Sequence, residues 1–255
     1  MHLSSSSNRL FSALTAFAVF LWIIFPGNAL CKNITLTAKD GYRIAATLTM
    51  PKQKSAVDSG VVLIHMYRNT KESWKPLQDE LVSRGITTLA IDLRGHGQSK
   101  LSPNGADDSI RVINREPQFF NTMYLDAEAA LNYLVEKLGI KPARTALVGA
   151  SVGCSIAIRT ALDNTVAAVV VMTPGRNYLG IPTMEHIKKW PGIPLLILTS
   201  EEEADRGAND IYAALQDRGA ELMVFQEEGI HGTNMFGEVE DIEKTIAEWL
   251  SRHLK

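Results

Sequence analysis

From Gly60 onward, short continuous apolar runs alternate with segments of helical period, and this alternation constrains the fold more than any other feature of the chain. A strand that is apolar along its whole length suits a sheet covered on both faces, which parallel strands joined by crossover helices provide. The apolar runs are residues 61–66, 86–93, 145–150, 166–173, 194–200 and 221–226. The pattern therefore predicts an α/β fold with a mostly parallel, doubly wound sheet.

Helical segments lie between these runs and after the last one, and a different pattern precedes them. We expect helices over residues 74–84, 124–138, 152–162, 208–218 and about 239–254. Before Gly60, the turn formers Lys39-Asp40-Gly41 separate two alternating stretches, residues 34–37 and 44–50, which is typical of a hairpin. The domain is therefore expected to open with antiparallel strands.

The first 29 residues have the layout of a secretory signal peptide: a polar start, an apolar run over residues 10–25, then Pro26 and Gly27. Gly27 and Ala29 are small residues at positions −3 and −1 of a cleavage before Leu30. We expect residues 1–29 to be removed on export to the periplasm or medium and residues 30–255 to form one domain. An uncleaved membrane anchor and a lipid-modified Cys31 are the alternatives.

Composition excludes several classes of partner. The net charge of −2 comes without a basic block, so nucleic acid is not an expected partner. We expect no stable membrane insertion of the processed chain, and the oligomeric state stays open.

Cys31 and Cys154 are too few for a disulfide framework, and Cys154 is expected to be a small buried apolar residue.

The sequence Gly149-Ala150-Ser151-Val152-Gly153 lies directly between an apolar run and a helical segment. Small residues on both sides of a serine permit a strained turn from strand to helix, which lifts the hydroxyl clear of the sheet. The helix N-terminus beneath it favours developing negative charge. The pattern predicts that Ser151 is a nucleophile. Alternatively, Ser151 only caps the following helix.

A serine hydroxyl near neutral pH needs a base that an acid orients, in the chain order serine, acid, histidine. His231 occupies the last place, because it follows the final apolar run and precedes the closing helix. Gly229 and Gly232 allow its loop to turn toward the serine. The order predicts that His231 is the general base, and the alternative is a loop histidine in solvent.

The acid is expected in Glu201-Glu202-Glu203-Ala204-Asp205, which follows the run at residues 194–200. Glu203 ranks first and Asp205 second, while the other carboxylates are interpreted as a solvated loop. The backbone N–H groups of Val152 and Tyr67 are the predicted oxyanion donors. Arg68, beside Tyr67, belongs either to the site or to the ordinary charged surface.

Two further loops bear on the site. Residues 92–99 are rich in turn formers, and we interpret Asp92, Arg94 and His96 as holding this loop by hydrogen bonds. Residues 100–121 form a longer connection than a simple strand-to-helix loop and are expected to shape the substrate site. The short interval between residues 173 and 194 leaves room for one short helix and for no large cap domain, so we expect an open site.

With these motifs in place, the chain resembles the α/β-hydrolase family over roughly residues 35–254. The likeness is strongest to its small lidless members related to dienelactone hydrolases and serine aminopeptidase-like esterases. It implies Ser151 as nucleophile, Glu203 as acid, His231 as base, and Tyr67 with Val152 as oxyanion donors. Relatives usually have Gly in place of Met66 and Asp in place of Glu203, so Asp205 stays open as the acid.

These features together predict a serine hydrolase that cleaves carboxylic esters through an acyl-enzyme, without a metal or other cofactor. Its expected partner is a small-molecule acyl substrate. Thioester, lactone or peptide cleavage would use the same residues, since selectivity depends on pocket walls built from distant loops. The alternative is a non-catalytic protein of the same fold that binds an acyl or hydrophobic ligand.

Overall fold

The computed structural model describes residues 29–52 and 58–255. The predicted signal peptide, residues 1–29, therefore lies outside the described residues except for Ala29. None of the helices that are described combines the length and apolarity needed to span a bilayer. Both cysteines are free thiols, Cys31 exposed and Cys154 buried.

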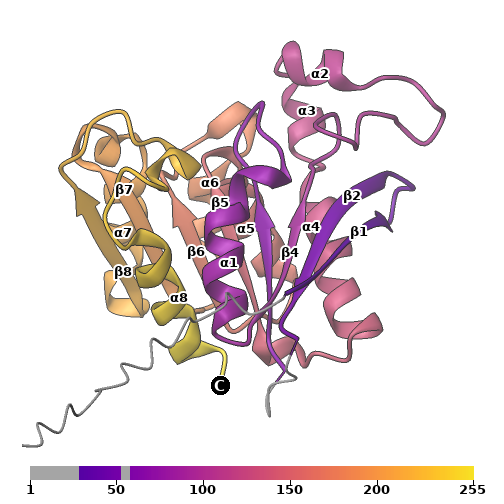
Figure 1. The fold of residues 1–255 in the computed structure, drawn as a ribbon. Coiled ribbons are helices and arrows are strands. Elements are labelled where there is room, and N and C mark those ends of the chain that lie inside the picture. The colour runs from indigo at the N-terminus through magenta and orange to yellow at the C-terminus, as the bar shows by residue number, and fades with distance from the viewer. Residues whose placement is uncertain (1–28, 53–57) are drawn as a thin grey trace, which may run out of the picture.

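The described residues form an eight-stranded sheet in the order β1-β2-β4-β3-β5-β6-β7-β8 (Figure 1). β1 (Leu30–Thr37) pairs antiparallel with β2 (Arg43–Met50), and β2 pairs antiparallel with β4 (Thr87–Ile91). All further pairings are parallel, through β3 (Gly60–Ile64), β5 (Thr145–Ala150), β6 (Ala168–Met172), β7 (Leu195–Ser200) and β8 (Ala220–Phe225). The predicted α/β class, with a mostly parallel sheet that opens with antiparallel strands, is confirmed.

Helices cover both faces of the sheet (Figure 1). One face carries α1 (Lys75–Ser83) and α8 (Ile242–His253), which pack on each other. The other face carries α4 (Tyr124–Asn132), α5 (Val152–Asp163), α6 (Thr183–Ile187) and α7 (Ala208–Leu215). A three-layer arrangement of this kind buries the sheet on both sides.

Strand β3 shows why the apolar runs are continuous. Val61 and Leu63 belong to the apolar cluster under α1 and α8, whereas Val62 and Ile64 belong to the cluster under α4 and α5. Successive side chains of a strand point to opposite faces, so a strand with helices on both sides needs an apolar residue at every position.

The connections differ in detail from the sequence-based expectation. The helix expected over residues 124–138 is α4 followed by a π-helical turn at Tyr133–Lys137. The segment at residues 100–121 contains two short helices, α2 (Ser109–Ile113) and α3 (Pro117–Phe120), which stand beyond the body of the sheet in Figure 1. Between β6 and β7 only a 3-10 turn and α6 intervene, so the described fold carries no large cap domain.

Candidate active site

Ser151 forms a strained turn between β5 and α5. Its φ of 53° and ψ of −117° are sparsely populated for a residue with a side chain. The neighbouring glycines make the turn possible: a Cβ on Gly149 would lie 2.2 Å from the carbonyl oxygen of Gly153, and a Cβ on Gly153 would lie 2.3 Å from that of Ile64. Any larger residue would push the start of α5 away from β3 and β5.

The Ser151 backbone is fixed to the neighbouring strand. Its N–H donates to the carbonyl of Met172, the last residue of β6, at 2.9 Å. Its own carbonyl accepts the N–H of Cys154 at 2.9 Å within the first turn of α5. The residue is 6% exposed, so the hydroxyl lies at a buried junction of strand and helix N-terminus.

The structure brings Glu203 and His231 together. His231 Nδ1 lies 2.5 Å from Glu203 Oε2, and the other carboxylate oxygen, Oε1, lies 2.9 Å from Nη1 of Arg206. Glu203 is nearly buried, which strengthens the interaction relative to one in bulk water. A proton on Nδ1 that is donated to the carboxylate leaves the lone pair of the neutral ring on Nε2.

Asp205, the second candidate acid, is held elsewhere. Its Oδ1 accepts a hydrogen bond of 2.6 Å from Nδ2 of Asn209 on the exposed surface. Glu202, which we interpreted as part of a solvated loop, is exposed and accepts the backbone N–H of Gly229 at 2.8 Å. The acidic loop therefore holds the histidine loop at two points.

The histidine loop packs beside the Ser151 turn. Gly232 directly follows His231, and a Cβ on Gly232 would lie 3.3 Å from the Cβ of Ala150, the residue before Ser151. It would also lie 3.0 Å from the sulfur of Met66. The loops that carry the serine and the histidine are thus neighbours, with Met66 against the same glycine.

The end of β3 leads into the loop that carries Tyr67. Gly153 lies against the carbonyls of Ile64 and His65, so the first turn of α5 contacts this loop. Among the described residues, no hydrogen-bond acceptor is present for the backbone N–H groups of Tyr67 and Val152. Two such N–H groups on adjoining loops suit an oxyanion. Arg68 is exposed and has a φ of 58°.

A buried ion pair ties the Tyr67 loop to the loop at residues 92–99. The Asp92 carboxylate accepts the backbone N–H of Lys71 at 2.8 Å, the Lys71 ammonium at 3.0 Å and the N–H of Gln98 at 2.9 Å. Arg94 pairs with Asp126 at 2.6 Å. These contacts match the structural interpretation of Asp92 and Arg94.

Histidines 65 and 96 belong to the same network. His65 Nε2 accepts the N–H of Leu93 at 3.0 Å, and burial lowers the pKa of His65 to about 3. The rings of His65 and His96 meet edge to face, with their centroids 4.9 Å apart. Burial also lowers the pKa of His96. Both rings are therefore uncharged at neutral pH, and they support the loop at residues 92–99.

Sequence reasoning missed two residues that contact the histidine loop. Tyr178 meets the His231 ring edge to face, with centroids 6.2 Å apart. Thr173 accepts the backbone N–H of Gly232 on its hydroxyl at 2.8 Å. Neither residue belongs to a motif. Their only sequence signal is their place after β6, at the carboxyl edge of the sheet where sites of such folds are found.

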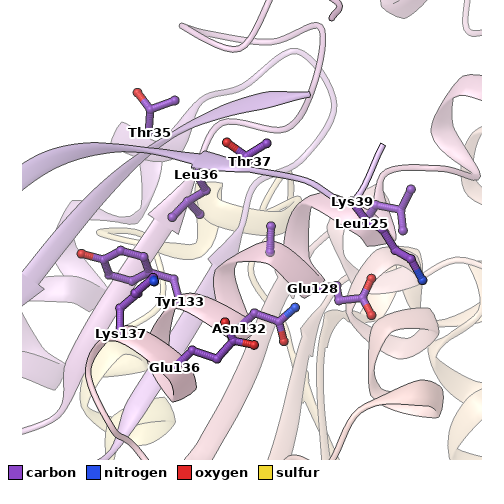
Figure 2. Close-up of a pocket in the computed structure, with 11 residues that line it drawn as sticks. Thr35, Leu36, Thr37, Lys39, Leu125, Glu128, Asn132, Tyr133, Glu136 and Lys137 are labelled. Atoms are coloured by element: carbon purple, nitrogen blue, oxygen red, sulfur yellow. The ribbon is translucent and has the colours of Figure 1, made fainter. Parts of the chain in front are cut away.

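A separate groove of about 580 Å³ lies between β1 and α4 (Figure 2). Strand β1 and the following turn supply Thr35, Thr37 and Lys39, while the helical side supplies Glu128 and Glu136 among others. None of the candidate catalytic residues lines it. The groove mixes both signs of charge and is distinct from the site around Ser151.

Comparison with known proteins places the chain in a family. The model of the alpha/beta hydrolase family matches residues 61–250. Solved structures with the same fold include an esterase of Pyrococcus furiosus, at 18% identity and a TM-score of 0.69, over 89% of this chain and 92% of that one. A carboxyl esterase of Bacillus coagulans matches at 13% identity and a TM-score of 0.68, over 88% and 99% of the two chains.

A dienelactone hydrolase from Anabaena variabilis is similar at 16% identity and a TM-score of 0.64, over 89% of this chain and 99% of that one. At these identities the likeness to solved structures shows the shared fold. The family match extends over most of the chain, from β3 into α8. The chain therefore belongs to the alpha/beta hydrolase family.

Proposed function

We propose that this protein is a serine hydrolase that cleaves carboxylic esters of small molecules through an acyl-enzyme. Family membership supports hydrolase activity. The observation that carries the finer proposal is the 2.5 Å contact between Nδ1 of His231 and Glu203, in a loop packed beside the strained turn at Ser151.

The proposed mechanism assigns one role to each group. His231 Nε2 removes the proton of the Ser151 hydroxyl while the serine oxygen attacks the ester carbonyl. Glu203 stabilises the imidazolium that forms. The N–H groups of Tyr67 and Val152 hold the carbonyl oxygen as it becomes negative. His231 then gives the proton to the departing alkoxide, which leaves as an alcohol and completes the acyl-enzyme.

Hydrolysis of the acyl-enzyme repeats these steps with water. His231 removes a proton from a water molecule, whose oxygen attacks the acyl carbon, and then returns the proton to the Ser151 oxygen as the carboxylic acid leaves. Proposed substrates are esters, with thioesters and lactones reacting in the same way. Solved structures of similar fold include two esterases and a dienelactone hydrolase, which supports ester and lactone substrates for the proposed activity.

A fluorophosphonate probe tests the nucleophile. We expect wild-type protein to be labelled on the peptide that contains Ser151, and Ser151→Ala to remain unlabelled with an unchanged melting temperature. An unlabelled wild-type protein would favour the binding-protein alternative. Hydrolysis of p-nitrophenyl acetate and butyrate, compared with an aminoacyl nitroanilide, tests the substrate class, and faster cleavage of the anilide would point to a peptidase.

A further inference from the structure

We infer that Thr173 is a positioning residue that sets the place of the His231 loop relative to Ser151. The inference rests on the proposed function, since it concerns how the proposed base meets the proposed nucleophile. Thr173 follows β6 and is 1% exposed. It is neither a nucleophile nor a base in this site, and its hydroxyl acts through two backbone groups.

The hydroxyl of Thr173 belongs to a short chain of hydrogen bonds between the two loops. The N–H of Gly232, the residue after His231, donates to Thr173 Oγ1 at 2.8 Å. Thr173 Oγ1 in turn donates to the carbonyl of Met172 at 2.7 Å. That same carbonyl accepts the N–H of Ser151 at 2.9 Å. Three hydrogen bonds thus connect the base loop to the nucleophile turn through one buried side chain.

The backbone of Thr173 is strained. Its φ is 52°, and a positive φ is a marked outlier for a β-branched residue. Such a conformation persists only where the surroundings determine it, and it occurs most often at functional sites. Here the Thr173 N–H donates to the carbonyl of Leu198 at 2.7 Å, which anchors the strained residue to β7.

Two strained residues therefore lie side by side. Ser151 has a φ of 53° at the end of β5, and Thr173 has a φ of 52° at the end of the neighbouring strand β6. The turn at Thr173 aims its hydroxyl at the Gly232 N–H, just as the turn at Ser151 presents the nucleophile. A hydroxyl is required because it both accepts from Gly232 and donates to Met172, which valine and alanine cannot do.

Thr173→Val, Thr173→Ala and Thr173→Ser test this role. The first two remove the hydroxyl, and the third keeps it without the methyl group. We expect Val and Ala to lower kcat and the rate of fluorophosphonate labelling between about tenfold and a hundredfold, because a displacement near 1 Å has effects of that order. KM should stay close to the wild-type value. Thr173→Ser should restore kcat and the labelling rate. If the valine variant does not fold, the comparison of the alanine and serine variants tests whether the hydroxyl is required.

Thr160→Val is the matched control. Thr160 is also fully buried, and its hydroxyl donates to the carbonyl of Ile156 within α5, without contact to the site. We expect it to lower the melting temperature without changing the labelling rate of the folded protein. Labelling of Thr173→Val and Thr173→Ala at the wild-type rate would overturn this inference and leave the proposed function standing. A wild-type protein that is not labelled at Ser151 would overturn the proposed function and this inference together.

Discussion

Glu202 and Gly229 are joined by a hydrogen bond of 2.8 Å, from the backbone N–H of Gly229 to Oε1 of Glu202. The next residue of the acidic loop, Glu203, holds His231. Two adjacent carboxylates therefore fix the turn at Gly229 and the imidazole two residues later, and only the second of them takes part in the proposed chemistry.

Glu202→Ala should lower kcat by roughly tenfold, since a loosened loop holds the imidazole less accurately. The melting temperature should change little, because a single exposed hydrogen bond contributes only about 1 kcal/mol. Ester hydrolysis and thermal unfolding of the same preparation measure the two effects. Glu201→Ala, an exposed neighbour, is the control, and an equal fall in that variant would show a general effect of charge.

Glu203→Gln should lower kcat on p-nitrophenyl butyrate by on the order of a thousandfold or more, because the base loses the carboxylate that orients it and stabilises its charged form. Asp205→Asn should keep nearly full activity, since Asp205 contacts Asn209 on the surface. Equal losses, or a greater loss in Asp205→Asn, would show that the acid is assigned to the wrong residue.

Asp92→Ala should lower the free energy of unfolding by about 3–5 kcal/mol, because the buried Lys71 ammonium would lose its buried partner and keep only the exposed carboxylate of Glu72. Asp79→Ala removes an equivalent carboxylate from the exposed pair with Lys75 and should cost at most about 1 kcal/mol. Urea unfolding of both variants measures the difference. Similar costs at the two sites would contradict a structural role for the buried pair.

Acid should destabilise the protein through His65. Burial lowers its pKa in the folded state to about 3, so between that pH and about 6.5 the unfolded chain binds more protons at this residue. The free energy of unfolding then rises with pH across this window and falls on acidification, by about 1.4 kcal/mol per pH unit from this group. The free energy of unfolding, measured with urea at pH values from 7 to 4, should change less steeply with pH in His65→Gln than in wild type. Parallel slopes would exclude His65 as the source.

Export should leave a mature chain that starts at Leu30. Mass spectrometry of the protein recovered from the periplasm or medium should show loss of residues 1–29. A mature chain that starts at a diacylglycerol-modified Cys31, or retention of the full sequence, would show that the processing prediction is wrong.

The strands could be predicted because burial on both faces leaves a direct trace in the sequence. The run at residues 145–150 coincides with β5, and the run at 194–200 differs from β7 by one residue. Helix type leaves a weaker trace: the apolar period continues through Tyr133–Lys137 although the backbone there widens into a π-helical turn. Likewise, the polar character of residues 100–121 concealed α2 and α3, whose turns are short.

Within the candidate site, residues that follow strand ends could be named as candidates from the sequence, and residues that act through space could not. Ser151, Glu203 and His231 follow strand ends in a fixed order, which sequence displays. The contact between Tyr178 and His231 depends on how the loop after β6 folds back, and local sequence does not record it. Thr173 is similar, because its strained φ and its bond to Gly232 exist only once β5, β6 and the last loop are assembled.

The glycines around Ser151 make the turn and the central strand interdependent. A Cβ at Gly149 would clash with the Gly153 carbonyl, and a Cβ at Gly153 would clash with the Ile64 carbonyl at the end of β3. Neither position can accept a side chain by itself, since a methyl group at one requires a shift of main chain at the next. The turn and β3 are therefore mechanically coupled, and a side chain added at either glycine would be felt at the end of the central strand.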